Sequence, residues 1–375
     1  MKINLNWKHA ILTFCVGAIC FIIGGIAMLR SCQNMIGDTG MSILEAHMII
    51  QKNFIGEFDK SSYLDTTLTA MVESLGDRWS YYLNKDNYSM LQTAHTNSYK
   101  GIGIQVAYDN DAGLQILNIY SDSPADVAGI IAGDILVAVN GQKVTEDNYN
   151  DLVNSIGTTE AVTLSIQKSD ETVRDVHLTP RTIIQDPVKS EMLEGNIGLV
   201  TISNFYENSA RGFKTHVDAL IDARATALII DVRDNPGGYI TELIEILDYL
   251  LPEGTICTCA TRTGESTIYT SDAACVNLPM VVIVNEASYS AAEFLAAELQ
   301  EAGGALLTGA PTAGKGFAQT TFDLKNGDAI GLSTFRYYTG KGVSLIDKGV
   351  TLDKEELEPD KQLQSAITIL QEKEE

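Results

Sequence analysis

Two serines that could act as nucleophiles lie in the segment "VNEASYSAAEFLAAELQ", residues Val284–Gln300. Ser288 and Ser290 follow a run of β-branched residues and come just before a helix-forming run. At such a turn a serine hydroxyl can attack a carbonyl carbon, provided that a base takes its proton. None of the histidines is near these serines in the sequence, so the segment leaves open which serine reacts and which residue is the base.

A candidate base occurs downstream, where "GAPTAGKGFAQTTF" places Lys315 between two glycines in a turn between apolar strands. Burial in an apolar site disfavours the ammonium form, and the neutral amine that results can accept a proton. A Ser–Lys pair is a known variant of the serine triad. Gln319, four residues further on, could hold the amine by a hydrogen bond. The alternative for Lys315 is a solvated lysine in a turn.

Backbone donors for a developing negative charge are expected in the segment "RDNPGGY". Its proline fixes one turn residue, and its glycines permit positive φ and close approach to a ligand. We expect the N–H groups of Gly237, Gly238 and Ala291 to form an oxyanion hole. Ser290 and Glu293 also fit a capping box at the start of a helix, which is the structural alternative for Ser290.

Strands and helices alternate in the part of the chain that contains these residues, 183–352. Such alternation indicates crossover units around a largely parallel sheet, and reactive groups gather at the carboxyl ends of its strands. His216 falls within one of the helices and is expected to be solvated. The segments are "IGLVTISNF", "SARGFKTHVDALIDA", "ATALIIDVRDNPGGY", "ITELIEILDYLLP" and "LPMVVIVN".

Short alternating strands with glycine turns characterise residues 99–182, and a β-sandwich with two helices is expected. Ser123 and Pro124 open one short helix, which Gly129 ends, and "VNG" closes a strand with an Asn-Gly turn. With "GIGI", "SPADVAGIIAGD" and "VNGQKV", this part resembles a PDZ domain. The resemblance implies that a carboxylate-binding loop turns backbone N–H groups onto a peptide C-terminus, while a strand edge pairs with the peptide. The loop residues are Gly101, Ile102, Gly103 and Ile104.

The N-terminus predicts a membrane anchor, because Ala10–Leu29 contains no charged residue and is long enough to cross a bilayer. Basic residues before this span favour a cytoplasmic tail, 1–9, and a body outside the membrane. Residues 30–98 are expected to be helical without catalytic residues, and His47 and His95 to be surface or packing residues. Residues 353–375 are expected to form a terminal helix that docks through Leu363, Ile367 and Leu370.

Charge and cysteine content limit the partners. The chain of 375 residues has 26 Lys and Arg against 49 Asp and Glu, a net charge of −23, which argues against nucleic acid. Outside the membrane, Cys275 could form a disulfide across a hairpin with Cys257 or Cys259. A C-x-C pair with one distant cysteine and no nearby histidine is a poor zinc set, so no metal site is predicted.

Together these segments resemble the carboxy-terminal processing proteases, serine endopeptidases with an embedded PDZ domain. The resemblance also covers "SLGDRWSYYL" and "STFRYYTGKGVSLIDKGVTLD". In that family the serine precedes the lysine by 25 residues, and 315 − 25 = 290, which selects Ser290. The family's glutamine, four residues after the lysine, falls on Gln319. Two positions depart from the family: Tyr289 replaces a small residue in G-S-A-S-A-S-E, and Ala313 replaces the aromatic of F-G-K-G.

The resemblance implies a membrane-anchored, extracytoplasmic serine endopeptidase that needs no cofactor. Its expected fold is an α/β protease core of crotonase-like βα units, with an inserted PDZ β-sandwich and an N-terminal helical region after a single transmembrane helix. Its expected partners are protein or peptide substrates with a free C-terminus and the membrane, and a homo-oligomer is left open. Two alternative functions are a PDZ adaptor that has lost turnover and a crotonase-type enzyme. The crotonase alternative explains neither the PDZ insertion nor the Ser–Lys spacing.

Overall fold

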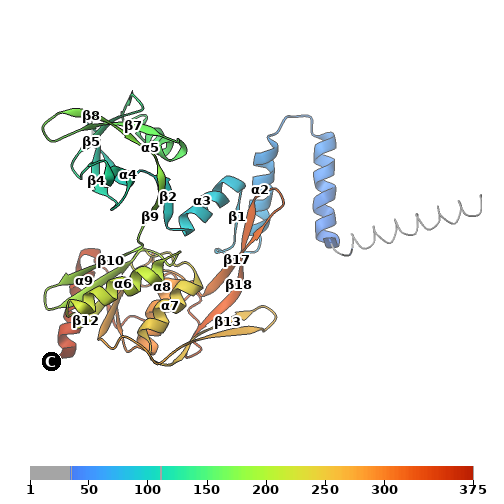
Figure 1. Cartoon of the computed structure of the whole chain (residues 1–375). Coiled ribbons are helices and arrows are strands. Elements are labelled where there is room, and N and C mark those ends of the chain that lie inside the picture. The colour runs from blue at the N-terminus through green and yellow to red at the C-terminus, as the bar shows by residue number, and fades with distance from the viewer. Residues whose placement is uncertain (1–33, 35, 110–111, 375) are drawn as a thin grey trace, which may run out of the picture. The chain divides into compact units, whose positions relative to one another are not determined.

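The computed structural model describes residues 34, 36–109 and 112–374 (Figure 1). The chain divides into two compact units, Met1–Thr66 and Thr67–Glu375. The predicted anchor, Ala10–Leu29, lies outside the described residues. Within the described ranges, no helix combines the length and the hydropathy that crossing a membrane would require.

Residues 30–98, expected to be helical, are mostly helical where the structure describes them. Residues 36–53 are helical, and α2 (Lys60–Glu73) and α3 (Lys85–His95) follow. His47 is a packing residue as expected, because its Nδ1 lies 3.3 Å from the Tyr63 hydroxyl. The expectation is wrong at β1 (Tyr81–Leu83), which pairs antiparallel with β18 (Ala329–Thr339). Adjacent tyrosines favour a strand, and this pairing fixes the segment to the sheet that contains β18.

Residues 99–182, which resemble a PDZ domain, form the expected strands and helices. The strands pair in the order β3-β4-β5-β7-β8, with β6 beside β5, and all pairings are antiparallel. The structure differs from the expected sandwich because these pairings join the strands into a continuous sheet. Register shifts in β3 and β5 bend it around its own core. The elements are β3 (Ile104–Asp109), β4 (Gly113–Ile119), α4 (Pro124–Val127), β5 (Ile135–Val139), β6 (Gln142–Lys143), α5 (Tyr149–Thr158), β7 (Val162–Gln167) and β8 (Val173–Leu178).

The local signals of this domain are confirmed. Ser123 caps α4, since its Oγ accepts a hydrogen bond from the Asp126 N–H at 3.1 Å. Asn140 and Gly141 have φ of 49° and 79°, the conformation of the expected Asn-Gly turn. A separate antiparallel pair, β2 (Ser98–Gly101) and β9 (Arg181–Ile184), links the ends of the domain.

The α/β core, predicted for residues 183–352, contains the expected largely parallel sheet. Its strands lie in the order β10-β11-β12-β15-β16-β19, and only the β10–β11 pairing among these is antiparallel. The helices α6, α7 and α8 alternate with the strands along the chain. The elements are β10 (Val188–Leu193), β11 (Ile197–Ile202), α6 (Ser209–Asp222), β12 (Ala227–Asp231), α7 (Ile240–Leu250), β15 (Met280–Val284), α8 (Ala291–Glu301), β16 (Leu306–Gly309) and β19 (Lys354–Glu355).

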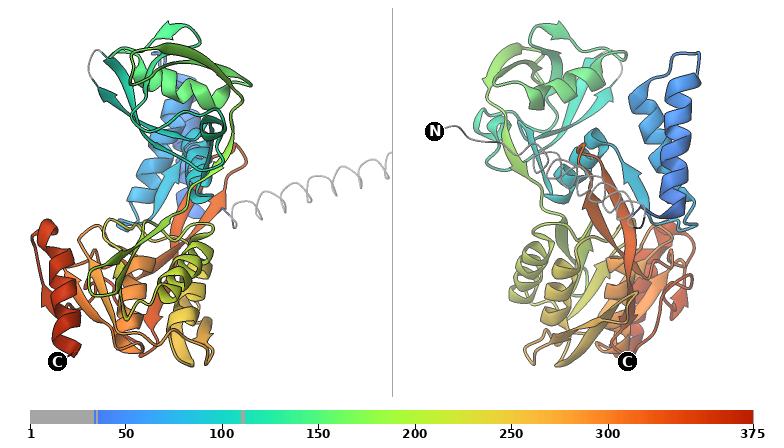
Figure 2. Two further views of the ribbon diagram at one scale, coloured as in Figure 1. Left: turned by 60° about the vertical axis from the view of Figure 1, so that its left-hand side comes forward. Right: turned by 90° about the vertical axis from the view of Figure 1, so that its right-hand side faces the viewer.

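Helices cover both faces of this sheet (Figure 2). Along β12, Leu228 and Ile230 pack in the core shared with α6, α7 and α8. The alternate residues Ala227 and Ile229 face a second core, which contains residues of α9 (Pro359–Glu374). Since side chains alternate between the faces of a strand, strands buried on both faces are apolar throughout, and the carboxyl ends carry the polar loops.

A second sheet pairs in the order β1-β18-β13-β14, with β17 (Phe317–Asp323) beside β18. Its hairpin β13 (Gly254–Thr261) and β14 (Ser266–Ser271) does not hold the suggested disulfide. Cys257 and Cys259 are buried free thiols that lie opposite Tyr269 and Thr267, whereas Cys275 is exposed beyond the end of β14. The expected pairing is therefore absent.

The C-terminal segment docks as predicted but is helical over a shorter range. Ala366, Ile369 and Leu370 are buried in the core beneath the sheet, and Leu363 and Ile367 pack against it. The helix starts at Pro359, which suits a first helical turn because proline has no N–H to leave unpaired. The residues before it instead form β19, which pairs parallel with β16.

Candidate active site

Ser290 stands at the sharp turn between β15 and α8. It is 9% exposed, and its backbone has φ 58° and ψ −121°, a conformation that a residue with a Cβ rarely adopts. Strain of this kind is typical of a nucleophile held on a strand-to-helix turn. The predicted capping box is present as well, with the Ser290 N–H donating to Glu293 Oε2 at 3.0 Å.

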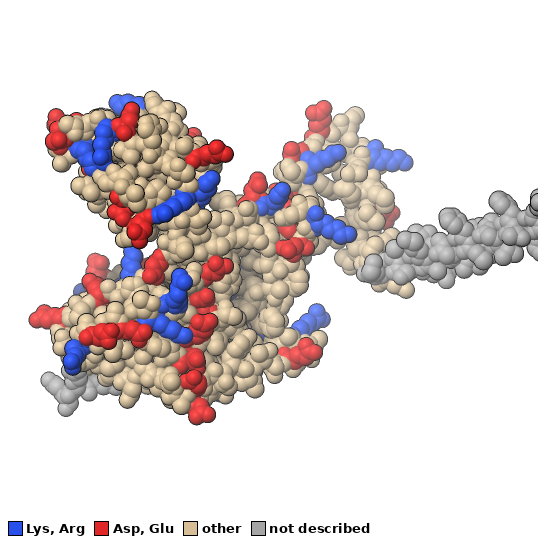
Figure 3. Space-filling model, in the orientation of Figure 1, with Lys and Arg blue, Asp and Glu red and all other residues tan. Residues whose placement is uncertain are grey.

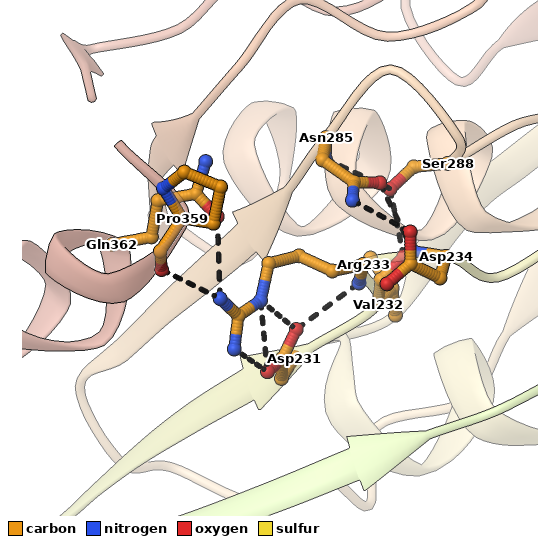
Figure 4. A network of polar contacts seen from close by, with 8 residues as sticks. All are labelled: Asp231, Val232, Arg233, Asp234, Asn285, Ser288, Pro359 and Gln362. Atoms are coloured by element: carbon orange, nitrogen blue, oxygen red, sulfur yellow. Dashed lines mark hydrogen bonds and ion pairs between the residues drawn. The ribbon is translucent and has the colours of Figure 1, made fainter. Parts of the chain in front are cut away.

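Ser288 has a structural role. It is completely buried, its hydroxyl donates to the Val232 carbonyl at 2.7 Å, and its Oγ accepts from the Asn285 N–H at 3.0 Å. Figure 4 shows this serine joined to the end of the neighbouring strand, where Asn285 also contacts Asp234. Ser288 therefore ties together the loops after β12 and β15, and its hydroxyl is already engaged.

The glycine loop approaches the serine closely. Gly237 has φ +85°, and a Cβ there would lie 2.9 Å from Ser290 Cβ and 3.0 Å from the Ala291 nitrogen. Its own N–H donates to Asn235 Oδ1 at 2.8 Å. The expectation that the Gly237 N–H is free to bind an oxyanion is therefore wrong. Of the three expected donors, the N–H groups of Gly238 and Ala291 have no hydrogen-bond acceptor within the described part of the chain.

Asn235 holds the glycine loop in place. Its side chain is buried and donates to the Ile202 carbonyl at 2.7 Å, and its own carbonyl accepts from the Tyr289 N–H at 3.1 Å. The loop after β12 is thus fixed both to the end of β11 and to the serine loop. These contacts hold Gly237 against Ser290, and Gly238 lines the same cleft as Ser290 and Ala291.

Glu293 connects the serine to the lysine. This fully buried carboxylate accepts from the Ser290 N–H and, at 2.8 Å, from the Lys315 N–H through Oε2. Its Oε1 accepts from the Thr312 hydroxyl at 2.6 Å and from the Gly314 N–H at 2.7 Å. The carboxylate therefore fixes the serine turn and the lysine turn relative to each other.

The environment of Lys315 favours a neutral amine. Burial lowers the pKa of its ammonium group from 10.5 to about 8, although the charges of Glu293 and Asp77 act in the opposite direction. The Nζ atom lies 4.9 Å from the ring centre of Trp79 and 5.4 Å from that of Tyr289. A lysine with a pKa of about 8 is about one-tenth neutral at pH 7, whereas a free lysine is neutral in fewer than about one in a thousand molecules.

The segment "GDRWS" also belongs to the site, although the sequence assigned it no catalytic residue. The Arg78 guanidinium donates to the Ala313 carbonyl at 2.6 Å, in the lysine loop. Burial acts to raise the pKa of the Asp77 carboxyl, but hydrogen bonds from Ser80 and Ser333 outweigh it and lower that pKa. The similarity of "SLGDRWSYYL" to the protease family was the available signal, but it did not identify which of its residues reach the lysine.

Gln319 lies in β17 and lines the same cleft as Ser290 and Lys315. Its Nε2 donates to the Phe317 carbonyl at 3.4 Å and to Ser333 Oγ at 3.3 Å. Ser333 in turn donates its N–H to Ser80 Oγ at 3.1 Å. The predicted bond from Gln319 to the amine is not among these contacts, which join the glutamine to the "GDRWS" segment.

A cleft of about 900 Å³ contains Ser290, Lys315 and Gln319 together with Gly238 and Ala291. Much of its wall is aromatic. The His95 ring lies 4.2 Å from that of Tyr206 and 5.4 Å from that of Tyr239, and burial lowers the pKa of the imidazole from 6.5. His95 is thus a packing residue, as expected, although it packs in the wall of the cleft. Apolar and aromatic walls with a few polar groups are typical of binding sites.

The predicted carboxylate loop of the PDZ domain precedes β3, an edge strand of its sheet. Gly103 has φ +80°, and a Cβ there would lie 2.1 Å from Ser123 Cβ, so only glycine fits. The carbonyls of Ile102 and Gly103 accept hydrogen bonds from Ala125 and Tyr120. Within the described ranges, the N–H groups of Ile102 and Gly103 have no acceptor, whereas Gly101 and Ile104 belong to β2 and β3.

Known proteins share both parts of this arrangement. The profile of peptidase family S41 matches residues 196–355, and that of the PDZ domain matches residues 115–168. A carboxyl-terminal-processing protease of Picosynechococcus sp. is 30% identical over 278 residues, which cover 72% of this chain and 67% of the relative. The chain belongs to peptidase family S41. It is therefore a serine-type peptidase, a hydrolase, and not a crotonase-type enzyme.

Other relatives agree with this assignment. The carboxy-terminal processing protease CtpA of Bacillus subtilis is 29% identical over 335 residues, covering 88% of this chain and 72% of the relative. Among solved structures, the photosystem II D1 C-terminal processing protease aligns with a TM-score of 0.50 at 23% identity, over 88% of this chain and 91% of the other. An S41 protease from Bacteroides fragilis aligns with a TM-score of 0.56 at 18% identity, over 85% and 92%. At these identities the structural matches establish the fold alone.

Ser288→Ala should destabilise the protein without removing the reacting groups. The Val232 carbonyl and the Asn285 N–H would lose a buried partner, so we expect the free energy of unfolding to fall by about 1–3 kcal/mol. Urea denaturation followed by circular dichroism measures the change. Loss of peptide cleavage in a fully folded Ser288→Ala protein would show that this serine has a role in the reaction.

Glu293→Gln should impair both stability and catalysis. One amide –NH₂ would face backbone or hydroxyl donors in place of a carboxylate oxygen, and we expect a loss of about 2–4 kcal/mol in the free energy of unfolding. Cleavage should fall at least tenfold, because the serine and lysine turns lose their common anchor. Glu286→Gln, at an exposed position in the same loop, is the matched control. Equal behaviour of the two variants would contradict this role for Glu293.

Proposed function

We propose that the protein is an endopeptidase in which Lys315 is the general base for Ser290. The observation that carries this proposal is the buried Glu293 carboxylate, which binds the backbone N–H of both residues at the same cleft. The low pKa of the Lys315 ammonium supports it, because a neutral amine can accept the hydroxyl proton. The helix α8 starts directly after Ser290, and its N-terminus favours developing negative charge.

The reaction follows from these groups. Lys315 Nζ takes the proton of the Ser290 hydroxyl as Oγ attacks the peptide carbonyl, and the resulting ammonium then gives that proton to the departing amine. The neutral lysine next takes a proton from water as the water oxygen attacks the acyl-enzyme carbonyl. When the bond to Ser290 Oγ breaks, the ammonium returns that proton to Oγ, which releases the second product and restores the enzyme. Gln319, in the wall of the cleft, is proposed to orient the amine in the substrate complex.

The oxyanion of the tetrahedral intermediate is proposed to bind the N–H groups of Gly238 and Ala291. Both amides lack an acceptor within the described residues, and both residues line the cleft that contains Ser290. Gly237 contributes its small size, since any side chain there would occupy the space beside Ser290. Backbone donors of this kind are already oriented before the reaction and stabilise charge as it forms.

The PDZ domain is proposed to recognise a free C-terminus or to gate access to the cleft. The edge strand β3 can pair with an extended peptide, and the amides of Ile102 and Gly103 can bind its carboxylate. Several relatives are named for carboxyl-terminal processing, which fits this substrate class. On the face shown in Figure 3, Lys and Arg are interspersed among Asp and Glu, so no extended basic patch favours nucleic acid there.

We propose that Ala10–Leu29 anchors the peptidase in the membrane with its body on the extracytoplasmic side. The length and lack of charge of this segment support the proposal. A reporter fused after residue 375 and tested for protease access in cells would check the orientation. Recovery of the full-length chain from the soluble fraction would contradict membrane anchoring.

Ser290→Ala and Lys315→Met should each abolish peptide cleavage while the fold is retained. We expect kcat/KM to fall at least about a thousandfold, since either change removes a group that acts in the transition state. Turnover is measured by incubating the protein with peptides of varied C-termini and identifying the products by mass spectrometry. Full activity of either variant would refute the Ser–Lys mechanism, whereas an inactive wild type that still binds peptides would support the adaptor.

Cleavage should increase with pH up to an apparent pKa of about 8. The active form is the neutral amine, and a group with pKa about 8 loses its proton as the pH rises through that value. Below this pH, kcat/KM should fall about tenfold for each pH unit, because it reports the free enzyme. A profile that is flat between pH 6 and about pH 9 would be incompatible with a lysine base of this pKa.

A further inference from the structure

The amine of Lys315 lies against a pair of aromatic rings. The ring centres of Trp79 and Tyr289 are 5.8 Å apart with an interplanar angle of 32°, and Nζ is 4.9 Å and 5.4 Å from them. Both rings are partly buried. One comes from the segment before the PDZ domain and the other from the serine loop, so the tertiary structure alone brings them together.

The backbone of each aromatic residue is held by a hydrogen bond. The Trp79 N–H donates to Asp77 Oδ1 at 3.1 Å, and the Arg78 guanidinium lies 4.4 Å from the Trp79 ring centre. The Tyr289 N–H donates to the Asn235 carbonyl. We call the two rings, of Trp79 and Tyr289, the aromatic cover.

An aromatic ring beside a lysine has two opposite effects. It excludes water, which disfavours the ammonium, and its face attracts a cation, which favours the ammonium. Burial is the main cause of the low pKa of Lys315, and the net change is downward despite the nearby carboxylates. Burial therefore outweighs the carboxylate charges at this amine, and the two rings contribute to that burial.

We propose that Tyr289 is a positioning residue that, with Trp79, keeps water from the Lys315 amine and so maintains it as a neutral base. The inference rests on the proposed function of Lys315. The tyrosine hydroxyl takes no part in this role, which needs only the ring. Tyr289 is the residue at which the sequence departs from the usual pattern beside the nucleophile.

The second departure is next to the first in space. The Ala313 N–H donates to the carbonyl of Ser288, the residue before Tyr289, at 3.3 Å. Ala313 stands where the related pattern has an aromatic residue near the lysine. This backbone contact joins the segment that carries the ring at 289 to position 313, and the proposed role of Tyr289 implies that its ring compensates for the ring missing at 313.

Other ionisable groups near the amine must be considered in any pH measurement. Glu293 and Asp77 act on its pKa through their charges, and the Arg78 guanidinium lies 4.4 Å from the ring centre of Trp79. Burial raises the pKa of the Tyr289 phenol, so that it stays neutral near pH 8. The cleft is also lined by further titratable side chains on α3, on β1, on β18 and near α6 and α7, namely Tyr88, His95, Tyr81, Tyr337, Tyr206, Glu207 and Tyr239.

The test compares Tyr289→Ala with Tyr289→Phe. The pH profile of kcat/KM is measured for each, and the pKa of Lys315 is measured separately by competitive labelling with trace acetic anhydride in the Ser290→Ala background. We expect Tyr289→Ala to raise the midpoint by about one pH unit, because water reaches the amine, and Tyr289→Phe to keep it. Phe322→Ala, at an exposed aromatic of β17, should also keep it.

A double variant tests whether a ring at another position restores the pKa of Lys315. Tyr289→Ala combined with Ala313→Phe should bring the midpoint back toward the wild-type value, since the second change returns a ring to the lysine. If Tyr289→Ala does not fold, Trp79→Leu tests the same cover from the other ring. A double variant with the same midpoint as Tyr289→Ala would overturn the proposed compensation.

An unchanged midpoint in Tyr289→Ala would overturn the inference, and a downward shift would show that attraction of the cation prevails. These outcomes differ from failure of the proposed function, in which Ser290→Ala would still cleave peptides. The labelling experiment reads the amine directly, so it decides the role of Tyr289 even if another residue is the base.

Discussion

The site depends on one buried carboxylate. Glu293 has no exposed surface, and a buried charge is stable only when its oxygens are well hydrogen-bonded. Here the donors come from the serine turn, the lysine turn and Thr312. Because these segments are separate in the sequence, satisfying the carboxylate requires that they meet. The interaction that stabilises the core of the site therefore also sets its geometry.

The loops around this carboxylate are held under constraint. Ser290 keeps a backbone conformation that is unfavourable for a side-chain-bearing residue, and Gly237 is packed against it with no room for a Cβ. Asn235 and Ser288 tie these loops to the ends of β11 and β12. The apolar strands of the parallel sheet supply the rigid base, which lets the strain at the turn persist.

The segment before the PDZ domain completes the site from the other side. Its "GDRWS" turn contacts the lysine loop through Arg78, and it places Trp79 over the amine. The network from Asp77 through Ser80 and Ser333 reaches Gln319. A peptidase core that lacked this segment would keep its nucleophile, but the environment of its lysine would change.

The sequence by itself determined the α/β core and the PDZ domain, because periodicity and turn chemistry are local signals. The spacing of the family that it resembles made Ser290 and Lys315 the candidate reacting residues. The sequence did not reveal that Tyr81–Leu83 is a strand, that Glu293 joins both turns, or that Trp79 and Tyr289 cover the amine. Contacts between distant segments leave no periodic pattern in a single chain. Only the tertiary structure decided them, since burial and hydrogen bonding depend on which segments meet.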